Sequence, residues 1–103
     1  MKIEFDRAKS ARNAKERGLS FELTAELDWN AARVRLDNRH DYGEEPFIAL
    51  VPKSRRLYVV CYCVRSEARR IISFRKANKR EERAYEKASD EVEDAGADET
   101  TDQ

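Results

Sequence analysis

The sequence predicts an α+β domain with two N-terminal helices, an antiparallel sheet of three or four strands, and one C-terminal helix. Two apolar runs in the middle of the chain, residues 47–51 and 57–64, are typical of buried strands. On either side, residues 7–17 and 79–88 are rich in residue types that favour helices. A chain of 103 residues is long enough for one small domain.

The N-terminal elements are expected to be short. Ile3 and Phe5 alternate with charged residues, as in a strand, and Asp6 is placed to cap the helix over residues 7–17. The apolar residues between positions 21 and 29 fit either a second helix or a strand. We favour a helix there because Glu, Leu and Ala dominate the segment.

The second half of the chain should supply most of the sheet and the last helix. The expected strands are residues 34–36, 47–51, 57–64 and 68–75. Strict alternation along the last strand would place Arg69 and Arg75 on the same face. Asn78 followed by Glu81 resembles a capping box, so the C-terminal helix is expected to begin at Lys79.

Charge is distributed unevenly along the chain. Residues 86–103 hold eight Asp or Glu and one Lys, which leaves 20 Lys or Arg and 13 Asp or Glu in residues 1–85, a net charge of +7. We therefore predict a basic domain over residues 1–88. An acidic tail over residues 89–103 is expected to be disordered, because it lacks the apolar residues needed to fold.

Several classes of protein are excluded by composition. No run of about 18 apolar residues is present to span a membrane, and no apolar signal segment begins the chain, so we expect a cytoplasmic protein. Cys61 and Cys63 lie two apart in an expected strand, without further Cys or His beside them. This spacing favours core packing over a disulfide or a zinc site. We expect no metal and no cofactor.

The strongest functional signal is a basic segment that follows the central strand. Between residues 65 and 83 there are eight Lys or Arg and three Glu, interspersed with apolar residues. Such a segment folds while displaying positive charge, which predicts binding to a polyanion, with RNA as the first candidate. The candidate RNA-binding residues are Arg69, Lys76, Lys79, Arg80, Arg83 and the loop aromatic Tyr42. The alternative is an ordinary charged helix face whose arginines pair with neighbouring glutamates.

A protein that binds RNA either leaves it intact or cleaves it, and cleavage without a metal would need groups that move protons at the 2′-hydroxyl and the 5′-oxygen, and cations that stabilise the phosphate oxygens. His40 is the only histidine, and with Glu44 or Glu45 nearby it is the candidate for proton transfer. Arg65 and Arg75 are candidates for holding phosphates, because a guanidinium fork binds two oxygens at once. The alternative is that these arginines lie on a solvated sheet face or pair with Glu44, Glu45 and Glu67 across the sheet.

A set of short motifs occurs in a fixed order between residues 3 and 86. The sharpest is Arg70-Ile71-Ile72-Ser73, followed by Arg75, Lys76 and Ala77. The others are F-D-x-x-K-x-x-x-N from Phe5, G-x-S-F-E from Gly18, D-x-R-H from Asp37 and L-Y-V-V from Leu57. In this order they resemble the BrnT family, the toxin half of a bacterial type II toxin–antitoxin pair.

This resemblance implies a RelE-like fold and a ribonuclease toxin that inhibits translation. It implies a BrnA-type antitoxin with a DNA-binding domain as partner, with promoter DNA bound only through the complex. Two departures support an alternative, a non-catalytic module that binds antitoxin or RNA: Glu16-Arg17-Gly18 replaces a K-H-G motif, and Pro46-Phe47 stands where an arginine is common. A DNA-binding regulator acting alone is least favoured, because no helix-turn-helix or ribbon-helix-helix signature is present.

Overall fold

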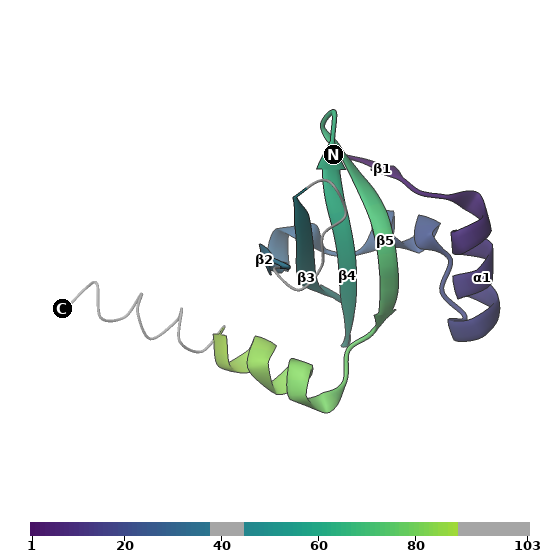
Figure 1. The fold of residues 1–103 in the computed structure, drawn as a ribbon. Coiled ribbons are helices and arrows are strands. Elements are labelled where there is room, and N and C mark those ends of the chain that lie inside the picture. Colours follow the sequence, from purple (N-terminus) through teal and green to yellow (C-terminus); the bar gives the residue numbers. More distant parts are fainter. Residues whose placement is uncertain (38–44, 89–103) are drawn as a thin grey trace.

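The computed structural model describes residues 1–37 and 45–88 and shows an α+β domain built on one five-stranded sheet (Figure 1). In chain order the elements are β1 (Lys2–Glu4), α1 (Arg7–Arg17), the 3-10 helices η1 (Phe21–Glu26) and η2 (Trp29–Ala31), β2 (Arg33–Leu36), β3 (Pro46–Lys53), β4 (Arg56–Arg65), β5 (Ala68–Lys76), and a C-terminal helix over residues 79–88. The strand order is β1-β5-β4-β3-β2, which puts β4 in the centre. No helix in these described ranges is long and apolar enough to cross a membrane.

The sheet differs from the prediction in strand number and in direction. Five strands are present, and β1 pairs parallel with β5 while the other three pairings are antiparallel. The expectation of a purely antiparallel sheet of three or four strands is therefore wrong. Alternation in the sequence identifies a strand but does not show which strand lies beside it. After β1, α1 carries the chain away from the sheet (Figure 1). The two edge strands, β1 and β2, therefore come from separate parts of the N-terminal segment.

The first helix forms as predicted. The Asp6 side chain accepts a hydrogen bond from the backbone nitrogen of Lys9 at 3.0 Å, which lowers the pKa of this carboxyl group. Gly18 ends α1 with a φ of 73°, a left-handed conformation that glycine adopts without the penalty a side chain would bring. Helix caps are local interactions, which is why the sequence predicts them well.

The second predicted helix is interrupted. η1 and η2 are two separate 3-10 turns, because the backbone between them is tied to the sheet: Asp28 N–H donates to the carbonyl of Pro52 on β3 at 2.9 Å. The side chains of Thr24 and Trp29 also hydrogen-bond to backbone carbonyls, of Phe21 and Thr24 respectively, at 2.7 and 2.8 Å. The prediction of helix over strand is right, but a continuous α-helix is not formed.

The core lies on the face of the sheet covered by η1 and η2. Its buried members are Leu19, Phe21, Leu27, Ala49, Val51, Val60, Tyr62, Ile71 and Phe74. α1 lies beyond the β1–β5 edge and buries only Ser10 (Figure 1). The helix is therefore held mainly by polar contacts rather than by an apolar face.

Two hydrogen-bonding side chains attach α1 to the domain. Ser10 Oγ accepts from the backbone nitrogen of Phe21 at 2.8 Å in a buried contact. Asn13 Nδ2 donates to the carbonyls of Leu19 and Phe74, at 2.8 and 2.9 Å. Asn13 thus links α1, the loop that follows it and the end of β5 through one amide group.

A β-bulge in β5 determines which way the C-terminal half of that strand faces. Ile71 lies opposite Tyr62 on β4, whereas Ser73 lies opposite Cys61, so Ile72 is an extra residue in the ladder. The extra residue reverses the alternation between the two halves of β5.

The prediction that Arg69 and Arg75 share a face is therefore wrong. Arg69 is on the core side of the sheet, with Ile71, and Arg75 is on the opposite side. Alternation from the sequence counts residues and does not detect a bulge.

The C-terminal helix begins at the predicted capping box and is anchored at two points. Asn78 N–H donates to Glu81 Oε1 at 2.9 Å, and Glu81 N–H donates to Asn78 Oδ1 at 2.8 Å. Arg75 donates from both terminal nitrogens to the two Glu81 oxygens, at 2.9 and 2.8 Å. One turn later, Tyr85 O–H donates to the carbonyl of Ala31 at 2.7 Å.

We predict that Asn13→Ala destabilises the domain by about 1–3 kcal/mol, because two partly buried carbonyls lose their donor. Asn13→Asp should be at least as destabilising at neutral pH, since a carboxylate of the same shape cannot donate to either carbonyl. Urea unfolding followed by circular dichroism measures both variants. The neighbouring, exposed Arg12→Ala is the control and should lie within about 0.5 kcal/mol of the unsubstituted chain. An Asn13→Ala variant with unchanged stability would contradict the role assigned to this amide.

We predict that Glu81→Gln loosens the C-terminal helix, because it removes the charge from both the capping box and the pair with Arg75. The pair is partly exposed, so the expected loss is about 1 kcal/mol, measured by urea unfolding and by the helical signal at 222 nm. Glu82→Gln, at an exposed position on the same helix, is the matched control. Equal effects of the two substitutions would show that the Arg75 contact does not hold the helix.

Candidate arginine face

Five arginines lie on the side of the sheet opposite the aromatic core, and we call this side the arginine face. The strand registers align two rows across it: Arg33, Leu50, Val59 and Arg75 in one, and Arg35, Ile48, Cys61 and Ser73 in the next. Further along β4 and β5, Arg70 lies opposite Cys63, and Arg65 lies opposite Ala68. The arginine face therefore consists of Arg33, Arg35, Arg65, Arg70 and Arg75.

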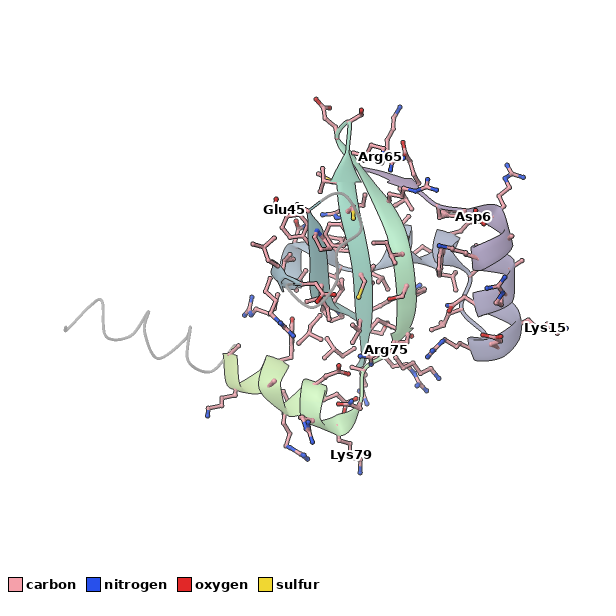
Figure 2. All side chains as sticks on the ribbon, viewed as in Figure 1. Asp6, Lys15, Glu45, Arg65, Arg75 and Lys79 are labelled. Carbon is pink, nitrogen blue, oxygen red and sulfur yellow. The ribbon has the colours of Figure 1, made fainter. Side chains whose placement is uncertain are left out.

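These arginines divide between two ends of the sheet. Arg65 and Arg70 are diagonal neighbours across the β4–β5 ladder. Arg75 is opposite Val59, six residues from Arg65 along β4, which corresponds to roughly 20 Å. Figure 2 shows Arg65 and Arg75 near opposite ends of the sheet. A single phosphate group therefore cannot contact both residues.

Arg75 is already engaged within the protein. Its two terminal nitrogens contact the two carboxylate oxygens of Glu81, and one of them also donates to the carbonyl of Lys76 at 3.2 Å. The hydrogen bonds to Glu81 are the main reason that the pKa of Arg75 is raised above its ordinary value, and Cys61, from the next row of the arginine face, adds to the effect. Arg75 thus forms an ion pair, but its partner lies on the C-terminal helix and is not one of the glutamates expected across the sheet.

Arg69 lies on the core side of the sheet and stacks on aromatic rings. Its guanidinium carbon is 3.8 Å from the ring centroid of Trp29 and 5.5 Å from that of Tyr62. Its Nε is buried, with no hydrogen-bond partner within the described residues. The stack packs the guanidinium group against the aromatic core, on the face away from the other arginines.

A groove separates the strands β2 and β3 from the C-terminal helix at the Arg75 end of the sheet. It has a volume of about 440 Å³, and its lining residues are Arg33, Val34, Arg35, Ile48, Leu50, Arg80, Glu81 and Ala84. Arg33 also lies over the ring of Tyr85, at 5.5 Å from its centroid. The structure thus brings Arg80, a predicted RNA-binding residue, opposite two arginines of β2 that the prediction missed.

The other predicted RNA-binding residues of the basic segment do not converge with Arg80. Lys76 is opposite Tyr58, which places it on the core side of the sheet. Lys79 and Arg83 are exposed on the C-terminal helix, and Figure 2 shows Lys79 at the side of the helix away from the sheet. None of the three lines the groove.

His40, Tyr42 and Glu44 lie outside the described residues, but both ends of their segment are described. Next to β2, Asp37 N–H donates to the carbonyl of Pro46 on β3 at 3.0 Å. Pro46 in turn lies opposite Cys63, close to the Arg65 end of β4. Figure 2 shows Glu45 at the same end of the sheet as Arg65.

Three members of the arginine face were not among the predicted site residues: Arg33, Arg35 and Arg70. The alternating R-V-R of β2 carries a signal, because it places two arginines on one face of a strand. The sequence gives no such signal for Arg70, because only the bulge puts Arg70 on the same side of the sheet as Arg75. Within the described residues, no group of three or more His, Cys, Asp or Glu side chains is arranged to hold a metal ion.

Comparison with curated proteins and with solved structures gave no match. A family model described as "Ribonuclease toxin, BrnT, of type II toxin-antitoxin system" matches residues 5–81. The match includes β2 to β5 and the first turn of the C-terminal helix, and so it contains every residue of the arginine face. This chain therefore belongs to the BrnT family of type II toxin–antitoxin ribonuclease toxins.

Proposed function

We propose that this protein is an endoribonuclease that cleaves RNA without a metal ion and thereby inhibits translation in the cytoplasm. The observation that carries the proposal is the arginine face, five guanidinium groups on one side of a sheet, in a chain that belongs to a family of ribonuclease toxins. We assign the activity to residues 1–88, in the RelE-like fold that the resemblance implies, and none of it to the acidic tail.

The cleavage centre is proposed to lie at the Arg65 end of the arginine face. Arg65 and Arg70 are diagonal neighbours there, which suits them to stabilise the oxygens of one phosphate as negative charge develops. The segment that carries His40 and Glu44 starts and ends at this same end of the sheet. We assign proton transfer at the 2′-hydroxyl and the 5′-oxygen to His40, with Glu44 as its partner or substitute.

Arg75 has a different role in this proposal. It is roughly 20 Å from Arg65 along the sheet, and Glu81 occupies its fork. We therefore assign it to positioning the C-terminal helix and not to the reacting phosphate. Lys76, Lys79 and Arg83 contribute a general positive field that attracts RNA, and Tyr42 is retained as a candidate for base stacking.

The proposed partner is a BrnA-type antitoxin with a DNA-binding domain, and the complex rather than the toxin alone binds promoter DNA. A protein antitoxin follows from membership in a type II toxin family. Residues 1–85 carry a net charge of +7, so an acidic surface on the antitoxin would speed association.

A second candidate function is a non-catalytic BrnT module that binds antitoxin or RNA. The engaged fork of Arg75 favours it, because one of the two arginines expected to hold phosphates is paired internally. The two functions differ in their dependence on His40, since proton transfer needs an ionisable group and simple binding does not.

We predict that the purified full chain cleaves RNA in the presence of EDTA, and that His40→Ala lowers the rate by about 100-fold or more. Arg65→Ala and Arg70→Ala should also lower it, whereas Arg12→Ala on α1 should not. Cleavage of total and of ribosome-engaged RNA is followed by gel electrophoresis, and melting curves confirm that each variant is folded. Cleavage that appears only with added Mg²⁺ would contradict the metal-independent mechanism. RNA binding without any cleavage would support the non-catalytic module.

A further inference from the structure

We propose that the groove between β2, β3 and the C-terminal helix binds a nucleotide of single-stranded RNA, with Arg35 and Arg80 on its phosphate. This inference rests on the proposed function for its ligand, because the nucleotide is one that flanks the cleaved bond. The site is separate from the proposed cleavage centre, since it lies in the part of the arginine face that contains Arg75.

The shape of the groove suits a small, partly apolar group. Ile48 and Leu50 form its aliphatic floor, and its volume of about 440 Å³ is within the usual range for small-ligand sites. Ala84 on the helix wall has a short side chain that leaves the space above the floor open. An unstacked base can rest against such an aliphatic surface.

Two arginines at this groove are available for a phosphate. Arg35 and Arg80 are both exposed, and within residues 1–37 and 45–88 neither side chain has a hydrogen bond or an ion pair. The acidic residue of the groove, Glu81, is already bound to the fork of Arg75, so it offsets that residue's charge. The cations that remain at the groove are suited to a phosphate, which binds the planar guanidinium group through two oxygens.

The groove is held open by contacts that do not involve Arg35 or Arg80. Tyr85 connects the helix to Ala31 through its hydroxyl group, and the ring of Tyr85 supports Arg33. At the other end of the groove, Asn78 and Glu81 fix the first turn of the helix. A preformed site of this kind loses little conformational freedom on binding.

The same groove would also accept an acidic segment of a protein, and the position of the groove favours RNA. It shares the arginine face with Arg65 and Arg70, which lie toward the other end of the sheet. A single strand that passes over this face meets both groups of arginines, and a charged groove of this kind tracks a nucleic-acid backbone. A strand held in this way contacts the protein at two places, so the groove should contribute to affinity rather than to the rate of the chemical step.

The test is binding of a fluorescein-labelled decauridylate to the full chain, measured by fluorescence anisotropy at several salt concentrations. All 2′-hydroxyl groups of this probe are methylated, so it is not cleaved. We expect Arg35→Ala with Arg80→Ala to weaken binding by about tenfold or more. The slope of log affinity against log salt should fall by about 1.4, because each arginine that no longer neutralises a phosphate charge lowers it by about 0.7. Arg35→Lys with Arg80→Lys should keep the slope and lose part of the affinity, because lysine keeps the charge without the fork.

Arg12→Ala with Lys15→Ala is the matched control, since it removes two exposed cations from α1, beyond the opposite edge of the sheet (Figure 2). Equal losses of affinity and slope in the groove and control variants would overturn the proposal. Unchanged RNA binding together with abolished antitoxin binding would also overturn it and identify a protein-docking groove. Weakened RNA binding in the groove variant, with unchanged binding in the control, would support the site. If the unsubstituted chain cleaved no RNA, that finding would reject the catalytic proposal and leave the groove proposal standing.

Discussion

The bulge at Ile72 is the constraint on which the arrangement of this sheet depends. Without an extra residue, a strand that begins with Arg69 on the core side would continue with Arg75 on that side and turn Phe74 outward. With it, Phe74 is 1% exposed and belongs to the core, and Arg75 reaches the opposite face. Burial of a phenylalanine ring contributes about 2–3 kcal/mol, so the core contact helps to offset the ladder hydrogen bonding that a bulge disrupts.

The bulge also separates the basic segment into two chemical environments. Arg69 stacks on Trp29 and Tyr62, where its guanidinium group packs as part of the aromatic side of the domain. Arg70 and Arg75 lie on the other side, away from those rings, together with Arg33, Arg35 and Arg65. A run of arginines that looks uniform in the sequence is therefore divided between two environments, and only the register of the strands distinguishes them.

The sequence predicts the helices and strands of this fold better than it predicts how they pair and contact one another. Asp6, Gly18 and the Asn78–Glu81 capping box are local signals, and all three act in the structure as predicted. The parallel pairing of β1 is not local, because Lys2 lies opposite Ala68, which is far away along the chain. The same limit applies to the site: the expected faces of Arg69 and Arg75 depended on unbroken alternation, and the capping box did not reveal that Glu81 also binds Arg75.

The contact between Arg75 and Glu81 explains how a helix can begin beside a basic sheet face. The first turn of a helix carries a partial positive charge from its free N–H groups, and here it starts next to Arg75 and contains Arg80. Glu81 places a carboxylate at this point, where it bonds Arg75 and a free backbone N–H together. The carboxylate of Glu81 thereby offsets the repulsion between Arg75 and the positive end of the helix. Arg75 thus holds Glu81, which lines the groove. Within the described part of the chain, the side chains of Arg35 and Arg80 remain unpaired at that groove.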